Sequence, residues 1–186
     1  MKYNLLPLAL VFGLSAYSVI AQDVVSGQHN VAINVPEIAI LDIESTDAPN
    51  ISFALDASGV EAGDQFIIDE ENSDLWINYT SLVIGPSNEK NITITGEVPG
   101  VVGLVISVVA SPHTGSGGGD FGTPTSVVVP STTPTNIITG IGSAYTGDGN
   151  TNGHNLTYYL DFNGNFEDLN SNDATSTISM TYTITD

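Results

Sequence analysis

The chain contains no cysteine, which excludes disulfide bonds, thiol nucleophiles, thiolate metal ligands and a lipidated N-terminal cysteine. With 186 residues it is long enough to bury most of its apolar surface without covalent cross-links. Packing and hydrogen bonding must therefore hold the fold together.

Basic residues are almost as scarce, because the chain has two lysines, Lys2 and Lys90, and no arginine. Against them stand 21 acidic residues, which give a net charge of −19 at pH 7. Phosphate binding needs Lys or Arg to displace counterions, so nucleic acid and anionic membrane surfaces are excluded as partners. The many negative charges of the folded chain repel one another, and salt or bound cations would reduce this repulsion by screening it.

Long apolar runs are absent, apart from a short one near the N-terminus. Lys2, the apolar residues 5–14, and the small or compact Val19 and Ala21 predict a secretory signal that is cleaved after Ala21. The run is interrupted by Pro7 and is too short for a membrane span, although a retained N-terminal anchor is the alternative. We expect a secreted or cell-surface protein whose mature domain covers residues 22–186, carries a net charge of −20, and does not insert into a membrane.

The mature sequence has the alternation of β-strands. In residues 177–185, Ile178, Met180, Tyr182 and Ile184 occupy one face and threonine or serine the other. Val31, Ile33 and Val35 alternate in the same way before Pro36, and the apolar residues of 38–43 continue the pattern in shifted phase. Further strands are predicted at 51–55, 75–83, 92–96, 101–110, 126–129, 136–141 and 156–162.

Strands at this spacing predict an all-β fold, namely a single immunoglobulin-like or jelly-roll-like β-sandwich of about 8–10 strands. The acidic stretch 56–74 is the least strand-like and is expected to form a loop or a short helix. The glycine-rich stretch 111–120 is expected to be a flexible connection.

Most catalytic signatures are missing. The chain has no Gly-x-Ser-x-Gly elbow and no phosphate-binding loop, and His29, His113 and His154 lack the spacing of zinc ligands. We therefore expect no catalytic residues and no enzyme activity. A hydrolase with an unrecognised pair of carboxylates is the weakest alternative, since so many acids permit many pairings.

Two oxygen-rich stretches are candidate metal ligands, with calcium as the candidate ion. Residues 148–153 match the opening of a calcium loop, but its twelfth position is Tyr159 instead of glutamate. Asp, Asn and Gly are also the residues of ordinary tight turns, which is the competing interpretation. The candidate ligands are Asp148, Asn150, Asn152, Asp161, Asn163, Asn165, Glu167 and Asp168.

Trp76 and Tyr79 are the candidate ligand-binding residues, because exposed aromatic rings stack on sugars. A single tryptophan inside an apolar strand is also typical of a core. The two readings stay open at this point.

Residues 34–38 (Asn-Val-Pro-Glu-Ile) and 181–186 (Thr-Tyr-Thr-Ile-Thr-Asp) resemble the ends of small bacterial surface sandwiches, the WxL-type cell-surface domains and the spore-coat-U-like fimbrial subunits. The chain departs from them in three ways. Trp76 lies in Leu-Trp-Ile instead of Trp-x-Leu, a second such motif near the C-terminus is missing, and so are the cysteines common in fimbrial subunits. The resemblance implies adhesion or polymerisation by strand exchange.

The start of the mature chain supports assembly independently of that resemblance. Val31, Ile33 and Val35 could add as a strand to the sheet edge of a neighbour. The alternative is that this strand pairs within its own domain and that the protein is monomeric. We therefore expect a non-catalytic extracellular structural or adhesive protein that self-associates or binds other surface proteins, as a filament or surface-layer subunit. The alternative is a secreted carbohydrate- or ligand-binding module that depends on calcium.

Overall fold

The computed structural model describes residues 26–46, 49–55, 58–64, 68–97, 103–164, 166–169 and 177–185. The chain divides into two units, residues 1–34 and 35–186. In the first unit the described residues, 26–34, form neither helix nor strand. The predicted signal peptide lies outside the described residues.

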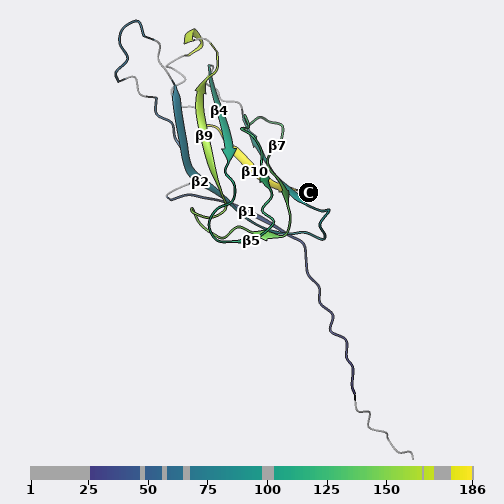
Figure 1. Cartoon of the computed structure of the whole chain (residues 1–186). Coiled ribbons are helices and arrows are strands. Elements are labelled where there is room, and N and C mark those ends of the chain that lie inside the picture. The colour runs from purple at the N-terminus through teal and green to yellow at the C-terminus, as the bar shows by residue number, and fades with distance from the viewer. Residues whose placement is uncertain are drawn as a thin grey trace, which may run out of the picture. The chain divides into compact units, whose positions relative to one another are not determined.

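The second unit consists of β-strands, ten of them within the described ranges, with one short 3-10 helix, η1, at Phe166–Asp168 (Figure 1). The strands are β1 (Ile38–Glu44), β2 (Asp69–Leu82), β3 (Lys90–Gly96), β4 (Leu104–Ala110), β5 (Gly118–Gly119), β6 (Thr123–Pro124), β7 (Thr135–Ile141), β8 (Ala144–Tyr145), β9 (His154–Phe162) and β10 (Met180–Thr185).

Antiparallel pairing joins these strands into two sheets. The first has the order β4-β9-β2-β8-β5, and β1 also pairs with β2. Residues Trp76 and Ile77 of β2 pair with both β1 and β9, so β1 and β9 lie on opposite edges of β2. The second sheet has the order β10-β3-β7-β6. The two sheets pack together, which confirms the predicted all-β sandwich.

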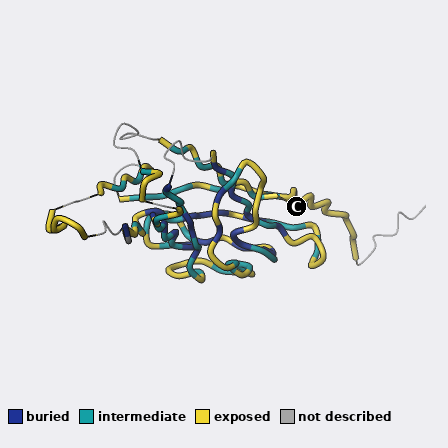
Figure 2. The backbone as a smooth tube through the Cα atoms, turned by 90° about the horizontal axis from the view of Figure 1, so that it is seen from above, coloured by how far each residue is buried: buried dark blue, intermediate teal, exposed yellow. Residues whose placement is uncertain are grey.

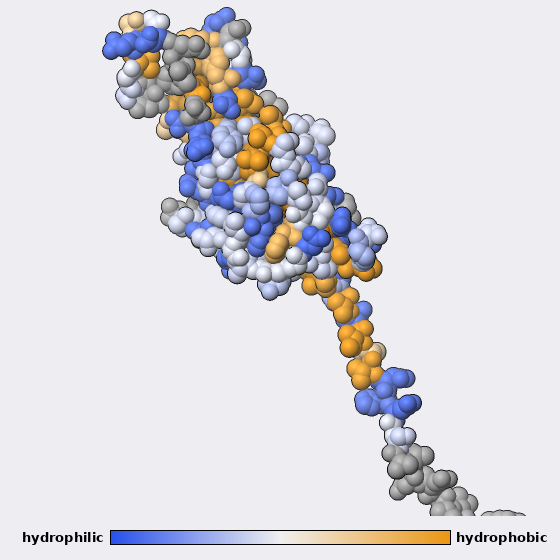
Figure 3. All heavy atoms as spheres, in the orientation of Figure 1, coloured by the Kyte–Doolittle hydropathy of each residue, from blue (hydrophilic) through white to orange (hydrophobic). Residues whose placement is uncertain are grey.

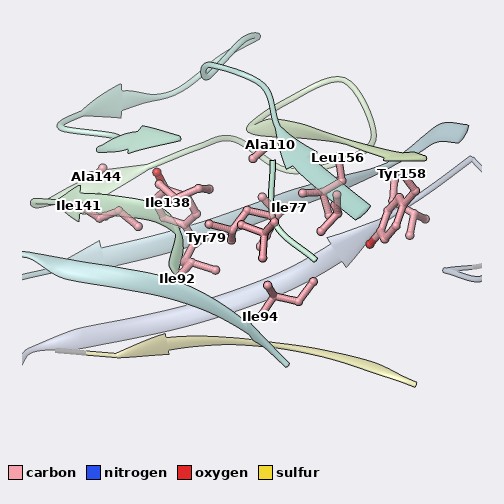
Figure 4. Close-up of a cluster of buried hydrophobic side chains, with 14 residues drawn as sticks. Ile77, Tyr79, Ile92, Ile94, Ala110, Ile138, Ile141, Ala144, Leu156 and Tyr158 are labelled. Carbon is pink, nitrogen blue, oxygen red and sulfur yellow. The ribbon is translucent and has the colours of Figure 1, made fainter. Parts of the chain in front are cut away.

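The core lies between the two sheets, where inward-facing side chains from both meet (Figures 2 and 4). Ile77 of β2 and Leu156 of β9 face Ile92 and Ile94 of β3, and all four are fully buried. Burial of one such side chain contributes about 1.5–3 kcal/mol. Along β3, buried and half-buried positions alternate, as expected when one face of a strand covers the core.

Two polar contacts supplement the apolar core. The hydroxyls of Tyr158 in β9 and Tyr182 in β10 lie 2.6 Å apart, which links the two sheets. The side chain of Lys90, at the start of β3, is buried and forms an ion pair of 2.6 Å with Glu37. Lys90, the only lysine or arginine of the chain besides Lys2, therefore stabilises the fold internally and adds almost no positive charge to the surface.

Of the other local predictions, the pattern at 177–185 is confirmed, whereas those at 51–55 and at the end of 56–74 are wrong. The pattern at 177–185 is confirmed, since half-buried Met180, Tyr182 and Ile184 alternate with exposed threonines. No strand forms at 51–55, although Ile51 and Phe53 pack against the core. The loop or helix predicted for 56–74 is wrong at its end, because β2 begins at Asp69 and pairs there with β9. Strands pair through main-chain hydrogen bonds, which need no apolar side chains. The side chains of Glu70 and Glu71 are exposed, so this part of β2 shows no apolar pattern.

The glycine-rich stretch is more ordered than predicted. Its residues Gly118 and Gly119 form β5 and pair with β8. Gly119 has a φ of 108°, and a Cβ there would collide with the backbone oxygen of Ser143. Glycine is needed at this position because the two backbones approach so closely.

Candidate functional site

In the predicted assembly segment, Val31–Val35, the apolar residues are exposed and unpaired. Val31 is 72% exposed, Ile33 82% and Val35 67%, and Figure 3 shows the run of apolar residues in this segment. No strand is assigned between residues 26 and 37, so the strand predicted at 31–35 is wrong for a single chain. The alternating pattern is present, but a strand also needs a sheet edge with which to pair.

The same segment is free of charge. No Asp, Glu, Lys or Arg lies between Asp23 and Glu37 in a chain that has 21 acidic residues. In extended conformation the side chains of Val31, Ile33 and Val35 would all lie on one face. An uncharged segment of this kind can add to a sheet edge without like-charge repulsion, using main-chain hydrogen bonds and alternate side chains.

The end of the segment is fixed by the ion pair described above. Glu37 follows Pro36 directly, and its carboxylate accepts a hydrogen bond from the buried Lys90 ammonium group. β1 then begins at Ile38 and pairs with the end of β2, where Ile38 lies opposite Leu82. No local sequence pattern predicts this contact, since it joins residues 53 positions apart.

Trp76 and Tyr79 do not form one binding surface. They lie three residues apart in β2, so their side chains point to opposite faces of the sheet. Tyr79 is buried in the core, whereas Trp76 is half-buried on the outer face, in register with Asn155 of β9. A stacking platform that combines both rings is therefore not present.

Tyr79 instead belongs to a buried polar cluster. Its hydroxyl contacts the backbone oxygen of Phe121 and lies 3.1 Å from Nε2 of His154, while Nδ1 of His154 lies 2.8 Å from the backbone oxygen of Ser111. His154 is fully buried. His113, 41 positions away in the sequence, meets it edge-on and stacks on the ring of Phe121.

This cluster has fewer protons than contacts at neutral pH. Its three contacts join the Ser111 carbonyl to the His154 imidazole, the imidazole to the Tyr79 hydroxyl, and that hydroxyl to the Phe121 carbonyl. Each contact needs one proton, but neutral His154 and Tyr79 supply only one each. A protonated imidazole would complete all three. Burial nevertheless lowers the pKa of His154, and the neighbouring His113 lowers it further, against the opposing effect of the Ser111 and Phe121 carbonyls.

The first oxygen-rich stretch is closed by its own hydrogen bonds. The side-chain oxygen of Asn152 accepts from the backbone N–H and the hydroxyl of Ser116, at 2.7 and 2.8 Å. Its amide nitrogen donates to the backbone oxygen of Asp148, and Asn150 contacts Thr46. Asn152 therefore stabilises a turn, which favours the turn interpretation over a calcium loop.

The second stretch lies at the other end of β9. Asp161 is exposed in that strand, Asn163 follows it, and Glu167 and Asp168 belong to η1; Asn165 lies outside the described residues. The nine residues of β9 separate the two stretches by about 30 Å, so they cannot form one site. Within the described ranges, no three His, Asp or Glu side chains are grouped closely enough to hold a metal ion.

The described part of the chain also contains no helix that is both long and apolar enough to cross a membrane. Comparisons with protein-family models, curated proteins and solved structures give no match. Any function must therefore be argued from the geometry of this chain.

The buried His154 predicts a loss of stability in mild acid. Because its pKa is lowered in the folded state, the unfolded chain binds more protons below about pH 6.5. The stability gained by keeping His154 neutral is therefore present above that pH and is lost as the pH falls towards the folded-state pKa. We expect the melting temperature to decrease between pH 7.5 and 5.5, a window above the range in which ordinary carboxylates titrate.

Two variants separate this effect from others. His154→Gln should be less stable at pH 7.5 but should show a weaker pH dependence across the window. His29→Gln, at an exposed position, should behave as the wild type. An unchanged pH dependence in His154→Gln would rule out this role of His154.

The hydrogen bonds of Asn152 predict that calcium has no specific effect on the loop at 148–153. We expect equal melting temperatures in millimolar calcium and magnesium, since both screen the negative charge alike. A saturable rise with calcium alone, lost in Asp148→Asn, would show binding through ligand linkage and would reject the turn interpretation.

Proposed function

We propose that the protein is an exported, non-catalytic structural subunit that self-associates when the segment Val31–Val35 of one copy adds as a strand to a sheet of another. The observation that supports this most directly is the exposure of Val31, Ile33 and Val35, between 67% and 82%. Three alternating apolar side chains in an uncharged segment have no core of their own to fill.

The energies involved favour a reversible contact. Burial of three such side chains contributes roughly 5–9 kcal/mol, and each main-chain hydrogen bond adds about 0.5–1.5 kcal/mol. Loss of translational and rotational freedom on association costs roughly 4–15 kcal/mol. The two sides nearly balance, so assembly should depend strongly on protein concentration.

The geometry of the contact determines the kind of assembly. The donating segment and the accepting edge are different parts of the same chain, which makes the interface heterologous. Such an interface leaves one free donor and one free acceptor at the ends of every open oligomer. Upon repetition it produces open filaments, or rings in which these ends meet. The net charge of the subunits opposes their approach, so moderate salt should promote assembly.

A matched pair of substitutions tests the proposal. Ile33 and Ile84 are exposed to nearly the same extent, 82% and 79%, but only Ile33 lies in the segment. We expect Ile33→Asp to remain monomeric, because an aspartate would have to be buried in the contact, and Ile84→Asp to assemble as the wild type does. Sedimentation over a range of concentrations, with negative-stain electron microscopy, measures both.

The folded state serves as the control, since neither substitution touches the core and both melting temperatures should equal that of the wild type. A wild-type protein that stays monomeric at all concentrations and salt levels would reject self-association. Assembly of Ile33→Asp at wild-type concentrations would reject the role of the segment.

A further inference from the structure

One edge strand of the sandwich has unpaired main-chain groups. In β4, both the N–H and the carbonyl of Val108 bond to Val128, at 2.8 Å each. Alternate residues of an antiparallel strand direct these groups to the same side, so those of Ile106 and Leu104 also point away from β9. Among the described residues neither has a main-chain partner on that side.

The reason for the gap is visible in the sequence after Val128. If the pairing continued, the next residue opposite β4 on that side would be Pro130, facing Ile106, and proline has no N–H to donate. The carbonyl of Ser131 then accepts a hydrogen bond from Gly96 of β3 at 2.9 Å. The segment therefore leaves β4 after a single bridge and crosses to the other sheet, which also explains why the strand predicted at 126–129 is absent.

An apolar hollow adjoins the open edge. It has a volume of about 230 Å³, and most of its lining is apolar, with Glu97 as its only carboxylate. The apolar side chains around it come from β4, from the segment before β7 and from the start of β10: Leu104, Ile106, Val129, Pro130, Ile178 and Met180. By contrast, the edge of β1 carries Asp42 and Glu44, and charges of this kind protect an edge from pairing.

We propose that the open edge of β4 and this hollow accept the segment Val31–Val35 of a second copy. The proposal rests on the proposed function and adds the accepting site. Leu104 and Ile106 offer four main-chain groups for hydrogen bonds, and alternate apolar side chains of the segment enter the hollow. The lack of charge in the segment suits a site that already contains Glu97.

The length of the chain shows why the occupant comes from another copy. Ile106 of β4 pairs with Leu160 of β9, and Leu160 pairs with Glu70 near the start of β2. Ile38, in contrast, pairs with Leu82 at the end of β2. These levels are about 40 Å apart along β2. Five residues separate Ile33 from Ile38 and span at most about 17 Å. The segment of the same chain therefore cannot reach the site, and assembly must proceed from one copy to the next.

The first test uses two valines that flank Val128. Val127 and Val129 are 54% and 57% exposed, but only Val129 lines the hollow. We expect Val129→Asp to raise the protein concentration needed for assembly by at least about tenfold, which corresponds to 1.4 kcal/mol. Val127→Asp should assemble at the wild-type concentration. Equal behaviour of the two variants would overturn the proposed site.

The second test exploits the absence of cysteine from the full-length mature chain. Ile33→Cys protein is mixed with Val129→Cys protein under mild oxidation, and mixed disulfides are measured on non-reducing gels. A disulfide needs Cβ atoms about 3.5–4.5 Å apart, so we expect this pair to cross-link several-fold more than Ile33→Cys with Ile40→Cys on the edge of β1. Preferential cross-linking to Ile40→Cys would place the acceptor at β1.

The outcomes separate the two proposals. If Ile33→Asp blocks assembly but Val129→Asp and the cross-links show no effect, the proposed function stands and the accepting site is wrong. If the wild-type protein does not assemble, both proposals fail.

Discussion

Burial of apolar surface between two sheets is the interaction on which the rest of this structure depends. No disulfide supports the fold, and a net charge of −19 opposes compaction. Burial of the core residues must stabilise the fold without cross-links and against this charge repulsion. Side chains such as Ile77, Ile92 and Leu156 are completely removed from water. Against that background the exposed Val31, Ile33 and Val35 are a marked exception. The proposed strand addition would cover them with a sheet edge of another copy.

The long strand β2 determines how far β1 lies from β4. It pairs with β1 near one end and with β9 along the other, and β9 in turn positions β4. Glu37, which follows the donating segment in the chain, forms its ion pair with Lys90 next to the Leu82 end of β2. The open edge of β4 lies level with Glu70. Within the sandwich, the point from which the donating segment leaves and the proposed accepting edge are about 40 Å apart along β2, which favours an extended assembly over a closed pair.

Much of the fold could be predicted from local patterns, because half-buried strands such as β10 show strict alternation. The acidic start of β2 could not, since its pairing with β9 leaves no pattern in exposed side chains. The same holds for the cluster around His154 and for the open edge of β4. Both depend on contacts between distant residues, Tyr79 with His154 and Val108 with Val128. The apolar alternation at residues 31–35 could be recognised because it is local, although the absence of a strand there could not be predicted.

The most direct test of strand addition is hydrogen–deuterium exchange in residues 30–36, compared between dilute monomer and assembled protein. In the monomer these amides should exchange at the rate of an unstructured chain, because no strand forms there. Assembly should slow exchange in this segment, and peptides covering Leu104–Ile106 should gain protection with it. Assembled protein in which residues 30–36 still exchange as fast as in the monomer would contradict the account.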